Sequence, residues 1–127
     1  MKEHGRRGQG LVEFALVVPI LLLIVLGAVE LGRAWMTRNI MTGAAREAAR
    51  IYVVPTGTQA TADARAWQVL SSAGINSSNA SIGYLDNGAY STCTVTITHN
   101  FNAIFSGFIP GLDNLALASS TSMRREY

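Results

Sequence analysis

The first third of the chain contains one uninterrupted apolar run. Residues Phe14 to Val29 read FALVVPILLLIVLGAV, and none of these sixteen side chains carries a charge. As an α-helix this run would be about 24 Å long, because each residue adds ~1.5 Å, and a bilayer core needs ~20 residues. Extending the run to Leu11 reaches that length but encloses Glu13, whose insertion into a membrane costs about 2.5–3.5 kcal/mol. We predict a hydrophobic helix over residues 9–31 that contains one acid.

Three interpretations of this apolar run are open. It could be a secretory signal cleaved near Gly27, although that site lacks the usual pair of alanines. It could be a plain membrane anchor. It could also be the helix of a filament subunit that is stored in a membrane and then packed against like helices. All three interpretations explain the apolar residues, but only the third gives Glu13 a physical role.

The helical pattern continues past the apolar run into a more polar sequence. Glu30 to Tyr52 is rich in Ala, Arg, Met and Glu, which all favour helices. Its apolar residues recur every three or four positions, as on one face of a helix. Pro55 and Gly57 end the pattern. We predict one helix over about residues 11–53, bent at Pro19 because proline removes a helical hydrogen bond.

The hydrophobic period changes after residue 57. Thr58 to Ala73 has apolar residues at helical spacing and is followed by Gly74, which predicts a short amphipathic helix. Beyond this glycine, apolar and polar residues alternate, as they do in strands with one buried face. We predict three strands, at Ser81–Leu85, Tyr90–His99 and Leu115–Met123.

The turn between the first two strands has the strongest local signal. Asn87-Gly88 is the dipeptide most typical of a hairpin, so the first two strands should pair antiparallel. In the second strand Cys93, Val95 and Ile97 share one face and threonines occupy the other. Phe101 to Leu112 then reads as an aromatic loop before the third strand.

These elements define an α+β fold. A three-stranded sheet buries too little apolar surface to be stable alone, so we expect it to pack on the C-terminal half of the long helix. The expected organisation is a basic leader at residues 1–8, a transmembrane or filament-core helix at 9–31 and a globular domain at 32–127. The globular domain includes the C-terminal half of the long helix.

The charges of the chain argue against a nucleic-acid-binding function. Charged residues make up 14% of the chain, against roughly 25% in a typical soluble domain. The formal net charge of +2 arises in the first eight residues, where Lys2, Arg6 and Arg7 outnumber Glu3. The rest of the chain is neutral, so we expect no basic surface of the kind that binds nucleic acid.

Candidate catalytic and metal-binding residues are few. Cys93 is the single cysteine, so no disulfide framework is predicted. His4 and His99 have no companions at the spacing of a zinc site. The sequence has no nucleophile, paired-carboxylate or phosphate-loop signature. We therefore expect no enzymatic activity, no catalytic residue, no cofactor and no metal.

The N-terminal sequence resembles the class III signal of prepilins. Residues 7–14 read RGQGLVEF, which places an acid and an aromatic residue fifth and sixth after Gly8. In that signal the prepilin peptidase cuts after the glycine, so the resemblance implies cleavage between Gly8 and Gln9. Glu13 would then be the fifth residue of the mature chain and Phe14 the sixth.

A longer stretch is similar to TadE-like proteins of the tight-adherence (Flp) pilus system. The similar segments are Val12–Leu16, Pro19, Leu21–Leu23, Glu30–Arg33 and Ser122–Glu126. The resemblance implies a pilin-like fold and a structural subunit, a pilin or minor pseudopilin, of a type IV-related filament. Such a subunit is stored in the bacterial inner membrane and then polymerised through its N-terminal helix into an extracellular pilus.

The resemblance also implies partners and assembly residues. The partners are other pilin subunits, in a homo- or heteropolymer, the prepilin peptidase and the inner-membrane assembly platform. The assembly residues are Glu13, Phe14, Pro19, Glu30 and Arg33. Glu13 would neutralise the new amino group of a neighbouring subunit. Glu30 and Arg33 also have the i,i+3 spacing of an ion pair on a helix surface, which we expect rather than a lock between subunits.

Two other functions remain open at this point. The chain could be a monomeric, single-span adaptor or binding protein of a secretion or adhesion system, with the helix acting only as a tether. It could also be a secreted binding module released after Gly27.

Overall fold

The computed structural model describes residues 4–108 and 114–125 and has the predicted α+β fold. A long helix, a short helix and a three-stranded antiparallel sheet follow one another along the chain. Three predicted features lie partly outside the described residues: the start of the basic leader at 1–3, the end of the aromatic loop, and Glu126 of the similar C-terminal segment.

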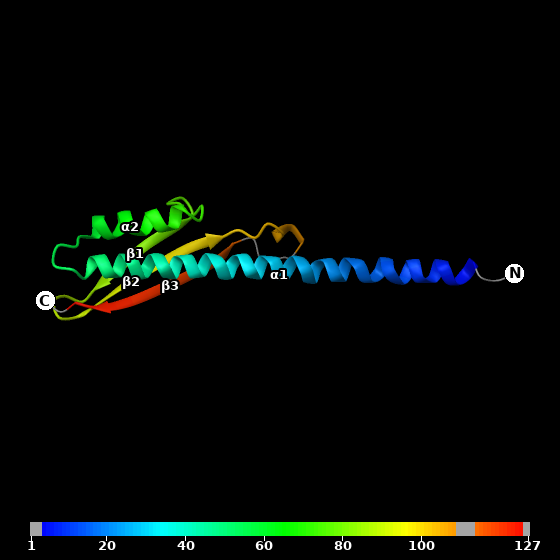
Figure 1. The fold of residues 1–127 in the computed structure, drawn as a ribbon, viewed down its shortest axis with the longest axis horizontal. Helices are drawn as coiled ribbons and strands as arrows, with labels where there is room; N and C mark the ends of the chain where they lie inside the picture. The colour runs from blue at the N-terminus through cyan, green and yellow to red at the C-terminus, as the bar shows by residue number, and fades with distance from the viewer. Residues whose placement is uncertain (1–3, 109–113, 126–127) are drawn as a thin grey trace.

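Helix α1, His4–Tyr52, is continuous over 49 residues. It begins earlier than the predicted residue 11, because the leader residues extend its hydrogen-bond ladder. Pro19 lies inside the helix, and the ribbon of α1 runs without a sharp kink (Figure 1). The predicted bend at Pro19 is therefore wrong. Proline removes one hydrogen bond, and here the ladder extends well beyond it on both sides.

The end of α1 depends on a glycine. The Gly57 N–H donates to the Val54 carbonyl oxygen at 2.8 Å, so the chain turns back tightly after the helix. A Cβ on Gly57 would lie 1.9 Å from the carbonyl oxygen of Ile51. Only glycine allows this close approach, which confirms the predicted end of the helix and explains its place.

Helix α2, Gln59–Ser71, has the capping expected of a short helix. Thr58 precedes it, and its side chain accepts from the Thr61 N–H at 3.3 Å while the Thr61 hydroxyl accepts from the Thr58 N–H at 3.0 Å. This reciprocal capping box satisfies two backbone donors. Gly74 follows the helix with a φ of +74°, a conformation that favours glycine.

The sheet has the strand order β1-β2-β3, and both neighbouring pairs are antiparallel. The strands are β1, Ala80–Asp86, β2, Thr92–Phe101, and β3, Leu115–Arg124. Asp86 pairs with Cys93 across the predicted hairpin, and Thr92 pairs with Arg124. Gly88 in the hairpin turn has a φ of +100°. The hairpin and all three predicted strands are confirmed.

Both helices cover one face of the sheet. Cys93, Val95 and Ile97 of β2 are fully buried against the helices, as the alternation predicts. Helix α1 meets β2, β3 and α2 through small residues, which lets these elements approach it closely. The fully buried alanines of this interface are Ala44, Ala45, Ala48 and Ala49 of α1 and Ala62 and Ala66 of α2.

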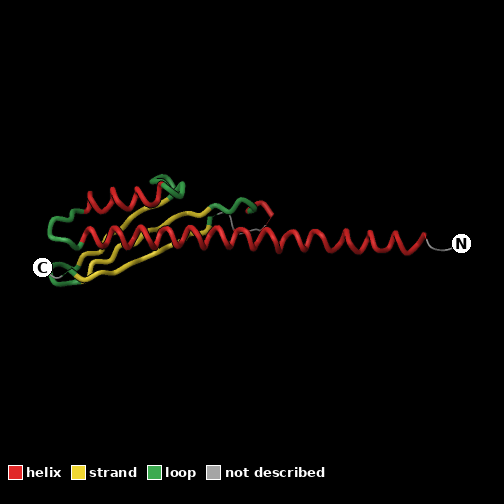
Figure 2. Tube along the Cα trace, in the orientation of Figure 1, coloured by secondary structure: helices red, strands yellow, loops and turns green. Residues whose placement is uncertain are grey.

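The C-terminal half of α1 lies within this packing, and its N-terminal half projects alone (Figures 1 and 2). We call residues 8–29 of α1 the rod. We call the remainder of the described chain, from residue 30 onward, the head. Glu30 is the first residue of α1 that the head buries.

Candidate assembly and membrane surface

The rod is an unpartnered apolar surface. Among the described residues, the segment Gly8–Tyr52 of α1 is long and apolar enough to cross a membrane by length and composition. None of its most apolar stretch is buried against the rest of the chain. A water-exposed monomer rarely shows an apolar patch larger than a few hundred Å². The rod is therefore built to be covered by lipid or by other protein.

The predicted cleavage position is sterically open. A Cβ added to Gly8 would meet no atom within 4 Å. Glycine inside a helix costs about 0.5–1 kcal/mol relative to alanine. The fold therefore gives no reason for glycine at this position.

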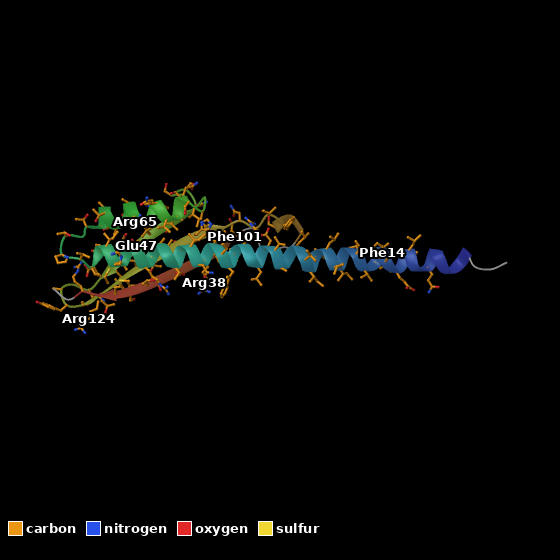
Figure 3. All side chains as sticks on the ribbon, in the orientation of Figure 1. Phe14, Arg38, Glu47, Arg65, Phe101 and Arg124 are labelled. Atoms are coloured by element: carbon orange, nitrogen blue, oxygen red, sulfur yellow. The ribbon has the colours of Figure 1, made fainter. Side chains whose placement is uncertain are left out.

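Gln9 and Glu13 lie side by side one turn apart on the rod. The Gln9 side-chain amide donates to Glu13 Oε1 at 3.2 Å, and both residues are exposed. Phe14 projects from the rod with 66% of its surface exposed (Figure 3). Three of the predicted assembly residues, Glu13, Phe14 and Pro19, are thus exposed and lie on the rod.

Glu30 and Arg33 lie where the rod enters the head. Arg33 Nη1 lies 2.7 Å from Glu30 Oε2, so the predicted i,i+3 pair is present. Glu30 is only 6% exposed, which is unusual for a pair on a helix surface. The guanidinium of Arg33 lies 5.2 Å from the centre of the Phe101 ring at the end of β2, within cation–π range.

The other oxygen of Glu30 binds the loop that follows β2. Glu30 Oε1 accepts from the backbone N–H of Ile104 at 2.7 Å and of Phe105 at 3.3 Å. We call residues 102–107 the junction loop. The expectation of a simple surface pair is corrected here, because the carboxylate also ties the junction loop to α1. A buried carboxylate is tolerated when such donors satisfy it.

The opposite end of the head has a second polar cluster that the sequence did not predict. Asp86 Oδ2 lies 2.9 Å from Arg125 Nη1 and accepts from the Tyr52 hydroxyl at 3.2 Å. The guanidinium of Arg125 also lies 5.1 Å from the centre of the Tyr52 ring. These contacts join the end of α1, the β1–β2 hairpin and the end of β3. Their spacing in sequence is long, so no local pattern reveals them.

The electrostatics of the head serve its packing. The Gly88 N–H, with Tyr52 and Arg125, lowers the pKa of Asp86 below its ordinary value. Burial raises the pKa of the Cys93 thiol, as expected for an inert core cysteine. Burial and a hydrogen bond to Asp63 also raise the pKa of Tyr84. Over residues 4–108 and 114–125, no group of three or more His, Cys, Asp or Glu side chains could hold a metal.

Comparison with known protein families places the N-terminal part of the chain. Residues 8–50 match the family model described as TadE-like protein. Over these residues the chain is similar to TadE-like proteins. The curated proteins and the solved structures gave no match to it.

The TadE-like segment covers the rod and almost all of the head portion of α1. It contains Gly8, Glu13 and Pro19, and it also contains the Glu30–Arg33 pair. The similarity expected at Ser122–Glu126 lies outside the matched residues. The matched segment of α1 contributes the exposed apolar surface of the rod and one wall of the core.

A shallow apolar hollow lies beside Glu30, on the side where α1 meets the ends of β2 and β3. Its volume is about 290 Å³. Apart from Glu30 its walls are glycine and apolar residues: Gly27, Leu31, Ala34, Phe101, Ala103 and Leu115. The apolar surface of the rod therefore continues onto the nearest part of the head.

Proposed function

We propose that this TadE-like protein is a structural subunit, a pilin or minor pseudopilin, of a Tad/Flp-type pilus related to type IV pili. It is stored in the bacterial inner membrane through the rod and is then polymerised through the same helix into an extracellular filament. The observation that carries the proposal is that none of the most apolar stretch of the rod is buried, combined with the similarity of this segment to TadE-like proteins. Its partners are other pilin subunits, the prepilin peptidase and the inner-membrane assembly platform.

The dimensions of the rod support storage in a membrane. Residues 8–29 extend about 33 Å at ~1.5 Å per residue, and the apolar core of a bilayer is ~30 Å thick. The rod ends at Glu30, the first residue of α1 that the head buries. The head can therefore remain in water while the rod crosses the bilayer.

The N-terminus of the rod supports processing by a prepilin peptidase. Glycine at position 8 weakens the helix and makes no close contact that would require it. Its small size instead suits a peptidase that cuts between Gly8 and Gln9. The function is structural, so the proposal includes no enzymatic activity, no cofactor and no nucleic-acid partner.

Glu13 supplies the register of assembly in this proposal. A lone carboxylate in an apolar surrounding must find a cation or become protonated. Cleavage after Gly8 creates an amino group at Gln9, and the Gln9 amide already lies 3.2 Å from the Glu13 carboxylate within one chain. In a filament, the same carboxylate would meet the Gln9 amino group of a neighbouring subunit.

The substitution Glu13→Gln tests the proposal, with Glu47→Gln as the matched control. Both remove one acid, but Glu47 lies in the head and pairs with Arg50 and Arg65. Each form would be expressed with the peptidase and the assembly platform, and sheared surface filaments would be counted at equal membrane levels. We expect Glu13→Gln to insert at least as well as the wild type and to give only a small fraction of its filaments. Glu47→Gln should give wild-type filament yield.

The outcome also separates the filament subunit from a membrane-anchored adaptor. Mass spectrometry of the wild-type chain should find Gln9 at its N-terminus. An N-terminus at Met1 together with an absence of filaments would support the adaptor. Equal filament yield from the wild type and from Glu13→Gln would remove Glu13 from the assembly mechanism.

A further inference from the structure

We propose that the junction loop is a second membrane contact, through which the head rests on the bilayer surface before assembly. Ile104 and the exposed apolar residues at the start of the head portion of α1 form this contact. The inference rests on the membrane-stored state of the proposed function, and it names the lipid headgroup region as the partner of this surface.

The position of the junction loop along α1 carries the first step. Of the described parts of the head, the segment that directly follows β2 reaches furthest along α1 towards its N-terminus (Figures 1 and 2). The hydrogen bond from the Ile104 N–H to Glu30 Oε1 places the loop level with the first residue after the rod. When the rod fills the apolar core of a bilayer, the loop lies at the depth of the lipid headgroups.

The side chains of this region carry the second step. Ile104 is 68% exposed although its backbone is held by Glu30. The loop is thus fixed with an apolar side chain facing outward, and the apolar hollow lies next to it. Trp35 is 63% exposed, one turn beyond Leu31, and tryptophan is enriched at the interface between membrane and water.

These residues also share the side of α1 that the head leaves uncovered. Leu31, Trp35 and Met36 are all more than 60% exposed. Successive helix residues are 100° apart, so these three span an arc of about 140°. A bilayer surface at this level would contact the whole arc.

Charge at the same level agrees with a lipid partner. Arg38 is exposed about one turn beyond Trp35, and Figure 3 shows it on α1 between Phe101 and Arg124. The Arg33 side chain is 41% exposed while it pairs with Glu30. Arginine side chains at this level attract anionic lipid headgroups. Arg33 and Arg38 are interspersed with Leu31, Trp35 and Met36 along α1, and such a mixture of arginine and apolar side chains suits the interface between membrane and water.

The test measures how deep three positions lie in a bilayer. The full chain would be inserted, one copy per nanodisc, into phosphatidylethanolamine and phosphatidylglycerol. Single cysteines at Ile20 in the rod, Ile104 in the junction loop and Leu85 in β1 would carry a fluorophore. All three native side chains are exposed, so the substitutions leave the core intact. Cys93 is fully buried, and labelling of the wild-type chain measures its background.

Quenching would be compared between lipids with a nitroxide in the headgroup and lipids with a nitroxide deep in the acyl chain. We expect the label at Ile104 to be quenched most by the headgroup nitroxide and the label at Ile20 most by the deep nitroxide. The label at Leu85 should stay at background, because Leu85 lies near the end of β1 at the hairpin, far from the rod (Figure 1). This pattern would support the inference.

The other outcomes overturn it in distinguishable ways. Strong quenching at Ile20 with background quenching at Ile104 would show that the rod spans the bilayer while the junction loop stays in water, which overturns this inference alone. Background quenching at Ile20 would overturn the membrane-stored state, and with it the proposed function. Shielding at Ile104 only in discs that hold two or more chains would identify a second copy as the occupant and would also overturn the lipid contact.

Discussion

The two halves of α1 share one backbone conformation but have opposite surroundings. In the rod, large branched side chains cover every side of the helix and stay exposed. In the head, Ala44, Ala45, Ala48 and Ala49 form a narrow stripe that is fully buried. Large side chains suit lipid chains, or like helices of other subunits, which can adapt to them. Small side chains allow a fixed sheet and a second helix to approach closely, so the same helix changes its packing chemistry near residue 30.

The largest expected difference between head and rod comes from shortening one leucine side chain to alanine in each. Leu70 of α2 is fully buried against α1, so Leu70→Ala should cost about 2–5 kcal/mol of head stability. Leu22 of the rod is 54% exposed, so Leu22→Ala should leave the head unchanged. The measurement is denaturant unfolding of the full chain in detergent micelles, followed by Trp67 fluorescence in a Trp35→Phe background. An equal loss from both variants would mean that rod and head unfold as one unit.

A second pair of variants enlarges alanine instead. Ala48→Leu should destabilise the head by about 1–3 kcal/mol, because the added atoms force apart elements that are already in contact. Ala28→Leu in the rod adds the same atoms to an exposed position. The same unfolding assay should show no change in the head for Ala28→Leu. Unchanged stability of Ala48→Leu would contradict the close packing of α1 on the sheet.

The two i,i+3 ion pairs of α1, Glu30–Arg33 and Glu47–Arg50, allow the end of α1 next to the rod to be compared with the interior of the head. Glu30→Ala leaves the N–H groups of Ile104 and Phe105 without their acceptor, and an unsatisfied buried donor costs about 1–3 kcal/mol. The loss should be local, so we expect faster hydrogen exchange at these two amides and a smaller change in global stability. Glu47→Ala removes an exposed partner of Arg50 and Arg65 and should leave exchange in the junction loop unchanged. Protection of Ile104 that survives Glu30→Ala would show that the carboxylate does not hold the loop.

The smallest expected effect is an acid-dependent loosening of the hairpin end of the head. The pKa of Asp86 is lowered in the folded chain, chiefly by the Gly88 N–H. A lowered folded pKa means that the stabilisation is present above the ordinary aspartate pKa and is lost as the pH falls through the folded value. Melting temperatures measured from neutral to acidic pH should therefore fall less steeply for Asp86→Asn than for the wild type. Identical slopes would exclude Asp86 from the acid response.

The sequence was sufficient to predict the elements that depend on hydrophobic periodicity and on local turn residues. The helix stripe, the short second helix, the hairpin at Asn87-Gly88 and the buried face of β2 depend on neighbours in the chain, and all are confirmed. The predicted bend at Pro19 was wrong, because a proline signal states only that one hydrogen bond is lost. Whether the helix bends depends on what packs against it, and nothing in the described chain packs on the rod there.

In the candidate site too, contacts between residues near in sequence could be predicted and contacts between distant residues could not. The i,i+3 spacing was enough to predict the Glu30–Arg33 pair, but the binding of Glu30 to the junction loop joins residues 74 and 75 positions apart. The Asp86–Arg125 pair likewise joins positions 39 apart. Such contacts depend on how the sheet lies across α1, which no local pattern contains. An acid directly after an apolar run was the one available signal that Glu30 needed more than one partner.

The absence of a joint between rod and head in α1 has a geometric consequence. Residues 4–52 form one continuous helix. Any translation of the rod along its axis, or rotation about it, is therefore transmitted directly to the head. In a continuous helix, one residue more or less in the rod shifts the head by ~1.5 Å along the axis and rotates it by about 100°. The length of the apolar segment therefore sets the rotation of each head about the axis of α1, as well as its height above the membrane.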